Sequence, residues 1–144
     1  MRLVLDTDVM VAGFRSDRGA SRQLLFSALD QRYDLLASVP LMFEYEAVLT
    51  RSEQLDAIGL RSVDVNAVLD AIAKVAIPVA LRFLWRPRLK DPADEMVLET
   101  AVNGNADGLV TFNTRHLAEG ARDFGIRVFR PFDAWKQVQK HEKK

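Results

Sequence analysis

The chain contains no cysteine, which excludes disulfide bonds, thiolate metal sites and cysteine nucleophiles. It holds only two histidines, so any metal ion would be bound mainly by oxygen ligands. Twenty basic and twenty acidic residues cancel, so a polyanion would have to meet a local basic patch rather than a net positive field. No apolar run approaches the roughly 20 residues of a membrane span, and no secretory signal opens the chain. We therefore expect a cytoplasmic protein without membrane contact.

The composition is that of a globular domain. Apolar residues make up 49% and charged residues 28% of the 144 residues, which is enough chain to bury one ordinary core. We therefore expect one domain over residues 1–135, followed by a basic C-terminal tail over residues 136–144.

Strand-like and helix-like segments alternate along the chain. The apolar patterns predict strands at residues 3–6, 33–37, 77–80, 108–111 and 126–129. They predict helices at residues 9–14, 20–29, 38–49, 62–75, 92–102 and from 132 onward, with a turn or short helix at 114–118. Residues 50–61 are polar and carry no predicted element, while Pro78 suits an edge strand. This alternation predicts an α/β fold with a mostly parallel central sheet covered by helices on both faces.

Three acidic residues fall where a folded chain normally buries apolar side chains. Asp6 ends the first predicted strand, and Glu44 lies on or beside the apolar stripe of its helix. Asp94 shares a helix face with Leu98 and Ala101. Each also has a purely structural interpretation, since helix capping would explain Asp6 and the helix dipole would explain Asp94.

Taken together, these acids favour a metal site. Ligands of parallel sheets bind beyond the carboxyl ends of the strands, where all three acids would converge. Like charges that close cannot all ionise without a cation, and the fitting cation for oxygen ligands is Mg²⁺ or Mn²⁺. Asp8 either caps the following helix or adds a further carboxylate, and the sequence leaves both interpretations open.

Four segments of the chain resemble the motifs of one family, the PIN-domain nucleases, and in particular its toxin-like group from bacterial toxin–antitoxin pairs. The segments are residues 3–9 (LVLDTDV), 40–49 (PLMFEYEAVL), 91–101 (DPADEMVLETA) and 110–113 (VTFN). Two positions depart from the family pattern. Asn113 stands where many members have aspartate, and Asp8 stands where an amide is more usual.

The resemblance implies hydrolysis of RNA phosphodiester bonds assisted by Mg²⁺ or Mn²⁺. Its implied metal ligands are Asp6 and Asp94, with contributions from Glu44 and Asp91, although Asp91 is also well placed to cap a helix that begins at a proline. Glu44 would orient or deprotonate the attacking water, and Asn113 would complete the outer part of the catalytic site. The resemblance further implies a small antitoxin protein as partner, and a homodimer.

Substrate binding requires cations near these acids, because phosphates supply most sequence-independent affinity. The candidates are Arg15, Arg88, Lys90 and Arg115, each of which is equally explained as a solvated surface charge. Two other functions remain open. Asp6 also fits the nucleophile of a haloacid-dehalogenase-like phosphatase, and the loss of a carboxylate at Asn113 fits a non-catalytic PIN-like module that binds RNA or a partner.

Overall fold

A parallel β-sheet forms the centre of the molecule. The computed structural model describes residues 1–16, 18–82 and 92–142, and within them the sheet has five strands. Their spatial order is β3 (Ile77–Pro78), β2 (Asp34–Ala37), β1 (Arg2–Leu5), β4 (Gly108–Val110) and β5 (Arg127–Phe129). All four neighbouring pairs run parallel. The predicted α/β fold is therefore confirmed, with β1 at the centre of the sheet.

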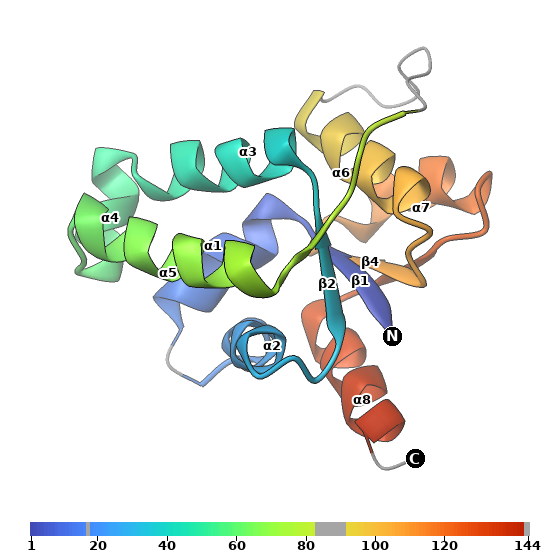
Figure 1. Cartoon of the computed structure of the whole chain (residues 1–144), viewed down its shortest axis with the longest axis horizontal. Helices are drawn as coiled ribbons and strands as arrows, with labels where there is room; N and C mark the ends of the chain where they lie inside the picture. Colours follow the sequence, from blue (N-terminus) through green and yellow to red (C-terminus); the bar gives the residue numbers. More distant parts are fainter. Residues whose placement is uncertain (17, 83–91, 143–144) are drawn as a thin grey trace.

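Helices lie on both sides of this sheet. They are α1 (Thr7–Arg15), α2 (Ala20–Leu29), α3 (Val39–Leu49), α4 (Ser52–Ile58), α5 (Ser62–Val75), α6 (Pro92–Asn103), α7 (Thr114–Arg122) and α8 (Pro131–Glu142). In Figure 1, α1, α3 and α5 lie to one side of the strands, and α6 and α7 lie to the other. Helix α3 packs against both α1 and α6, and α6 also packs against β1. The helices that carry the predicted acids are thus neighbours around the central strand.

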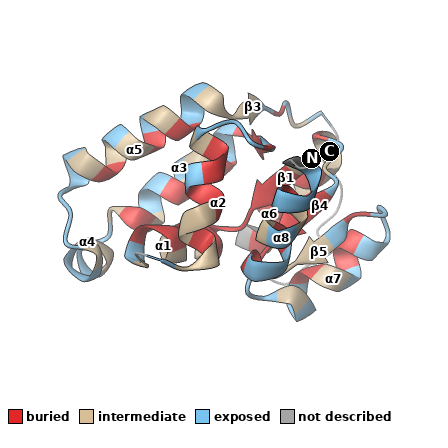
Figure 2. Ribbon diagram, turned by 90° about the horizontal axis from the view of Figure 1, so that it is seen from below, coloured by how far each residue is buried: buried red, intermediate tan, exposed pale blue. Residues whose placement is uncertain are grey.

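The core is built on the two middle strands. Leu3, Val4 and Leu5 of β1 are fully buried, as are Leu109 and Val110 of β4. Figure 2 shows this burial running along β1 and β4 and along the sides of the helices that face them. Continuous apolar runs of this kind are typical of parallel strands that are covered on both faces.

Two local predictions are confirmed at single residues. The Ser38 hydroxyl accepts a hydrogen bond of 3.3 Å from the Leu41 amide, so Ser38 caps α3 as its position before a proline-containing turn suggests. Strand β3, which contains Pro78, lies at the edge of the sheet. An edge strand tolerates proline because the N–H that proline lacks is not needed for pairing with a second neighbour.

The sequence missed one helix and misplaced the ends of others. Residues 50–61 contain α4, which ends at Gly59 in a left-handed conformation with φ of 79°. None of its residues is buried, and a helix without a buried face leaves no apolar stripe to detect. Helix α1 begins at Thr7 rather than residue 9, and α7 continues to Arg122 rather than residue 118.

The C-terminal segment is helical as well. Residues from 136 belong to α8 as far as Glu142, and Val138 within them is buried. In the described parts of the chain, no helix combines the length and apolar character that a membrane span requires.

Candidate functional site

Parallel pairing brings two distant residues together at the carboxyl edge of the sheet. Leu5 of β1 is in register with Val110 of β4, and the next residue, Asp6, donates its amide to the Val110 carbonyl at 2.8 Å. Thr111, which follows Val110, therefore lies beside Asp6. Its hydroxyl donates a hydrogen bond of 2.7 Å to Oδ2 of Asp6.

Asp6 is held in place by the backbone on both sides. It stands at the N-cap of α1, and its Oδ1 accepts a hydrogen bond of 2.7 Å from the Thr7 amide. Asp6 therefore caps α1, as its structural interpretation predicts, and this role leaves a second role as metal ligand open. On the strand side, the hydroxyl of the fully buried Tyr45 in α3 donates to the Leu5 carbonyl. Asp6 itself is 5% exposed, so its carboxylate is a buried group at a fixed place.

Asp8 turns toward the same point from the first turn of α1. Its Oδ2 accepts a hydrogen bond of 3.1 Å from the Phe112 amide and a longer one of 3.4 Å from the Thr111 hydroxyl. Its other oxygen, Oδ1, is buried and has no hydrogen-bond partner. A buried carboxylate oxygen without a donor costs about 1–3 kcal/mol or more, and a bound cation would remove that cost.

The two carboxyl groups are also difficult to ionise together. Burial and, after it, the charge of Asp8 raise the pKa of Asp6 from its ordinary value of 3.8 to about 6. Burial also raises the pKa of Asp8. Both shifts oppose negative charge, so the site suits either a shared proton or a divalent cation. The carboxylate and hydroxyl oxygens present are the ligand types that Mg²⁺ and Mn²⁺ prefer.

The acids on the helices are less exposed than typical surface acids. Asp94 in α6 is 8% exposed, as its place on the apolar face predicts, and Glu44 in α3 is half-buried. Within residues 1–16, 18–82 and 92–142, however, no three acidic or histidine side chains lie close enough together to hold a metal ion. The structure therefore brings Asp6 and Asp8 together, and the larger ligand set that adds Glu44 and Asp94 stays a prediction.

The remaining predicted residues lie around this pair or outside the described chain. Asn113 is exposed and directly precedes α7, and its side chain forms no capping hydrogen bond to that helix. Its backbone N–H donates a hydrogen bond of 2.9 Å to the Thr111 hydroxyl. Arg15 and Arg115 are exposed. The predictions that fall outside the described residues concern Arg88, Lys90 and Asp91.

Three residues of this region had no role predicted from the sequence. Thr111 links the two acids, and Tyr45 fixes the backbone before Asp6. Glu95 in α6 is 6% exposed, and its charge contributes to the raised pKa of Glu99, one turn further on, after the effect of burial. The sequence signal for Glu95 is its i, i+4 spacing to Glu99, which places two like charges on one helix side.

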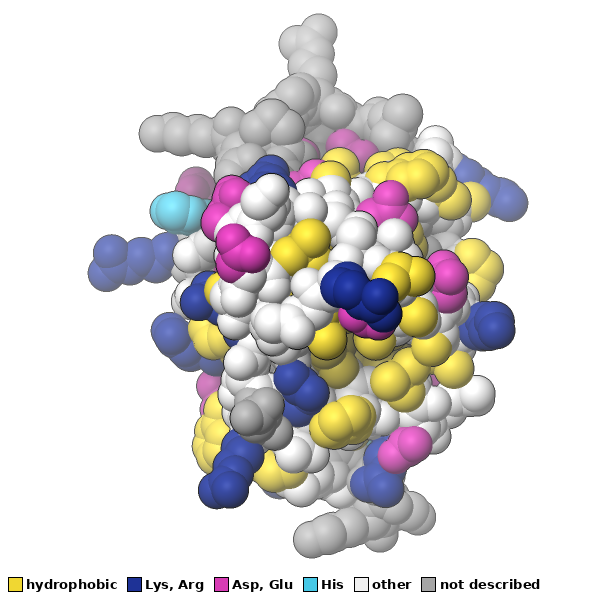
Figure 3. All heavy atoms as spheres, turned by 90° about the vertical axis from the view of Figure 1, so that its left-hand side faces the viewer, with side chains coloured by type: hydrophobic (Ala, Val, Ile, Leu, Met, Phe, Trp, Pro, Cys, Tyr) yellow, Lys and Arg dark blue, Asp and Glu magenta, His cyan; other side chains and the backbone are white. Residues whose placement is uncertain are grey.

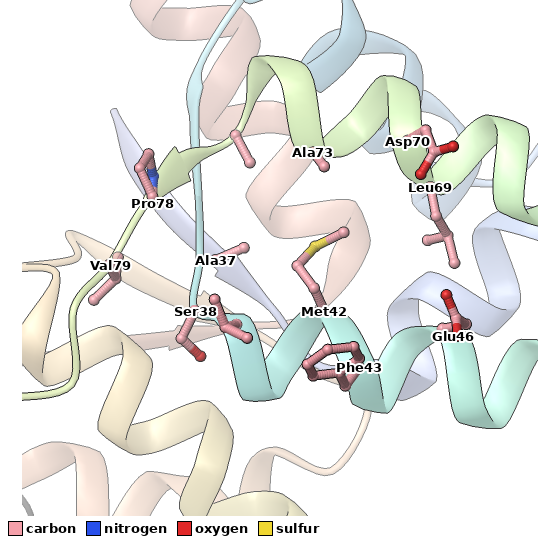
Figure 4. A pocket seen from close by; sticks show the side chains of 12 residues that line it. Ala37, Ser38, Met42, Phe43, Glu46, Leu69, Asp70, Ala73, Pro78 and Val79 are labelled. Carbon is pink, nitrogen blue, oxygen red and sulfur yellow. The ribbon is translucent and has the colours of Figure 1, made fainter.

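An apolar pocket of about 360 Å³ lies elsewhere, between α3 and α5. Met42 and Phe43 line it from α3, and Leu69 and Ala73 line it from α5 (Figure 4). Figure 3, seen from the side of α4 and α5, shows hydrophobic side chains gathered among charges of both signs. The two acids that line this pocket, Glu46 and Asp70, are exposed, so the pocket lacks the buried carboxylate that distinguishes the site at Asp6.

Comparison with known proteins agrees with the geometry at the sheet edge. The family profile of the PIN domain matches residues 2–115, a span that includes Asp6, Asp8 and Thr111. No curated protein sequence matches the chain. PIN domains are commonly nucleases and typically bind divalent metals at acidic residues. The chain belongs to the PIN domain family.

Proposed function

We propose that this protein is a divalent-metal-dependent endoribonuclease that hydrolyses phosphodiester bonds of RNA. The observation that carries the proposal is the pair formed by the buried carboxylate of Asp6 and the half-buried carboxylate of Asp8, joined by Thr111 at the carboxyl edge of a PIN domain. Oδ1 of Asp8 is buried and accepts no hydrogen bond within the described residues, so it is available to bind a metal ion.

Mg²⁺ or Mn²⁺ is the proposed cofactor. Asp6 and Asp8 would hold it together with Asp94, and Glu44 and Asp91 are further proposed ligands. When bound, such an ion lowers the pKa of a water molecule and offsets negative charge on the scissile phosphate. The donor set fits, because it consists of carboxylate oxygens and contains no sulfur ligand.

The chain's own groups have separate tasks in this proposal. The Thr111 hydroxyl and the Thr7 amide orient the two oxygens of Asp6, so the carboxylate cannot rotate freely. Glu44 accepts the proton of the attacking water, for which its half-buried position in α3 is suitable. The side-chain amide of Asn113 contacts the RNA substrate. Asn113 carries no charge, so its task is positioning rather than metal neutralisation.

RNA binding is proposed to involve cations around the acidic pair. Arg15 and Arg115 are exposed, and Arg115 lies two residues after Asn113, in the first turn of α7. Arg88 and Lys90, which precede Asp91 in the sequence, are proposed to join them. Contacts of this kind bind phosphates without reading the base sequence.

The test is cleavage of single-stranded RNA by the purified protein with Mn²⁺ or Mg²⁺. Wild type should cut the strand, EDTA should stop the reaction, and Asp6→Asn should lower the rate by a factor of roughly 100 or more. Asp34→Asn is the matched control. Asp34 is exposed at the start of β2, at the sheet edge opposite to the acidic pair, so this variant should leave the rate unchanged. Cleavage that survives both EDTA and Asp6→Asn would contradict the proposal.

Two other results would identify the alternative functions. A wild-type protein that binds RNA but cuts neither RNA nor DNA would instead be a non-catalytic PIN-like module. A stable beryllofluoride adduct at Asp6 would indicate a phosphatase. Membership of the PIN family speaks against the phosphatase.

We further propose that the protein is the cytoplasmic toxin of a toxin–antitoxin pair and forms a homodimer. Motif resemblance supports this proposal, and so does the apolar pocket between α3 and α5, where Val39 is 68% and Phe43 66% exposed. Glu46 and Asp70 lie toward one end of that pocket (Figure 4), and neither forms an ion pair within the described residues. Apolar walls with acids at one end suit an antitoxin segment that carries apolar and basic side chains.

Co-expression with a small protein encoded beside the gene tests this partner. A complex that weakens with Phe43→Asp but not with Phe26→Asp, an exposed phenylalanine on α2, would support the pocket as its docking site. If the neighbouring gene encodes no small protein that binds the chain and inhibits cleavage, the toxin proposal fails while the nuclease proposal stands.

A further inference from the structure

An exposed aromatic residue is bonded through its backbone to the acidic pair. Phe112 follows Thr111 in the sequence, is 41% exposed, and donates its amide to Oδ2 of Asp8 at 3.1 Å. The residues on either side of it are tied as well, because the Asn113 amide donates to the Thr111 hydroxyl. The ring is joined to this fixed backbone by two rotatable bonds, so it remains near the acids in every rotamer.

Exposure alone would not distinguish Phe112, since isolated exposed apolar side chains are common. Its backbone bond to Asp8 does distinguish it. The other exposed phenylalanines of the described chain are Phe26, Phe43, Phe124 and Phe132, and none of them has a hydrogen bond to Asp6 or Asp8. Helix α7 buries Leu117 and Ala121 against the core, whereas Phe112 precedes the helix and keeps much of its ring in solvent.

A free cation accompanies the ring. Arg115 lies three residues further on, is exposed, and forms no ion pair within the part of the chain that the structure describes. Proteins that bind single-stranded nucleic acids without sequence preference combine these same two elements. Aromatic rings stack on the bases, and basic side chains follow the phosphates.

We propose that Phe112 stacks on an unpaired nucleobase of the RNA beside the phosphate that is cleaved. This inference rests on the proposed nuclease function, which it deepens by naming the form of substrate. In a duplex, both faces of each base are covered by their neighbours, so the ring finds no partner. In a single strand or a loop, a base can turn out and stack on the ring, while Arg115 contacts the adjacent phosphate.

Binding is measured first with Ca²⁺ in place of Mn²⁺, so that a cation offsets the charge of the two carboxylates, and gel electrophoresis checks that the strand stays intact during the measurement. The probes are a short fluorescein-labelled oligoadenylate, the same strand in a duplex, and the same strand with each base in turn replaced by an abasic residue. Phe112→Ala should bind the single strand roughly tenfold more weakly than wild type, and Phe112→Trp should restore binding. Phe26→Ala, which changes a phenylalanine on α2 that is 50% exposed, serves as the control and should bind like wild type.

The abasic strands separate stacking from a structural role. At one position, the abasic strand should bind wild type and Phe112→Ala equally weakly, because the base that the ring contacts is missing. In cleavage with Mn²⁺, Phe112→Ala should raise KM and leave kcat nearly unchanged. The inference is overturned if Phe112→Ala binds and cleaves like wild type, or if its defect is the same on every abasic strand.

The two proposals fail in different ways. A wild-type protein that cuts no RNA, but whose binding to single strands still depends on Phe112, would contradict the nuclease function and support the stacking. A protein that cuts single strands and duplexes equally well would support the nuclease function and overturn the stacking.

Discussion

The Thr111 hydroxyl donates a hydrogen bond of 2.7 Å to Oδ2 of Asp6, joining two residues that are 105 positions apart in the sequence. The bond exists because β1 and β4 pair in parallel and in register, so that the residues after Leu5 and Val110 meet at one edge. A neutral hydroxyl thereby holds a buried carboxylate in one orientation. The bond also lowers the pKa of Asp6, against the larger opposing effect of burial.

Replacing this hydroxyl should therefore affect both stability and chemistry. Thr111→Val should lower the free energy of unfolding by about 1–3 kcal/mol, because Oδ2 of the buried Asp6 loses its donor. It should also lower the rate of RNA cleavage, since Asp6 is no longer oriented. Thr111→Ser keeps the hydroxyl and should retain most of both. Denaturant unfolding and a cleavage assay measure these effects, and equal behaviour of the valine and serine variants would contradict the role of the bond.

Tyr45 and Tyr33 form a matched pair for separating stability from activity. Both are buried, and each hydroxyl donates to a backbone carbonyl, that of Leu5 for Tyr45 and that of Leu24 for Tyr33. Either change to phenylalanine should lower the free energy of unfolding by about 1–2 kcal/mol. Only Tyr45→Phe should also lower kcat, because Leu5 directly precedes Asp6. If Tyr33→Phe lowers kcat by the same factor, Tyr45 has no special role in positioning Asp6.

The pKa of Asp6 gives a prediction for stability against pH in the metal-free protein. Its folded-state pKa of about 6 lies above the ordinary value of 3.8, so the folded state binds the proton more tightly than the unfolded state. The stabilisation from this proton is fully present below pH 3.8 and is lost as the pH rises through 6. Its size is about 3 kcal/mol at most, from a shift of roughly two pKa units.

Asp6→Asn should remove that dependence. Relative to wild type in EDTA, the variant should gain stability between pH 4.5 and pH 7.5, by about 1–3 kcal/mol. Urea unfolding of both proteins at the two pH values measures the gain, and contributions from groups that do not interact with Asp6 cancel in the comparison. A difference between the two proteins that is the same at both pH values would show that Asp6 is not strained by its charge.

The unpartnered oxygen of Asp8 predicts a stabilising effect of metal. A divalent ion that binds the folded protein at a hundred times its Kd should raise the free energy of unfolding by about 2.7 kcal/mol. Asp8→Asn should remove most of this gain from Mn²⁺, while Asp34→Asn should keep it. Thermal melts with Mn²⁺ and with EDTA provide the measurement. If Asp8→Asn is stabilised by Mn²⁺ as much as wild type, Asp8 orders the segment at Phe112 and is not a ligand.

Much of the fold follows from the sequence, because its signals are local. Ser38 and Pro40 mark the start of α3, Pro78 marks an edge strand, and Asp94 lies on the face that its helix buries. The missing helix is α4, whose residues bury no face and so carry no periodic apolar signal.

The candidate site is less accessible from sequence because it depends on contacts across the sheet. Asp6 is recognisable as an acid at the end of a buried strand, but its bond to Thr111 depends on which strands become neighbours. For the same reason, the sequence gives no sign of the hydrogen bond that Asp8 accepts from the Phe112 amide, and the ligand role of Asp8 stays a prediction. Asn113, expected in the outer part of the site, is exposed, and Thr111, for which no role was predicted, contacts the acids.

Mn²⁺ binding to the metal-free protein, followed by titration calorimetry, is the measurement closest to the proposed role of Asp6. Wild type and Asp34→Asn should bind Mn²⁺, whereas Asp6→Asn and Asp94→Asn should lose binding by a factor of at least roughly ten to a hundred. The Asp94 variant tests the predicted extension of the ligand set from α6. Undiminished Mn²⁺ binding by Asp6→Asn, or no binding by wild type, would contradict a metal site anchored at Asp6.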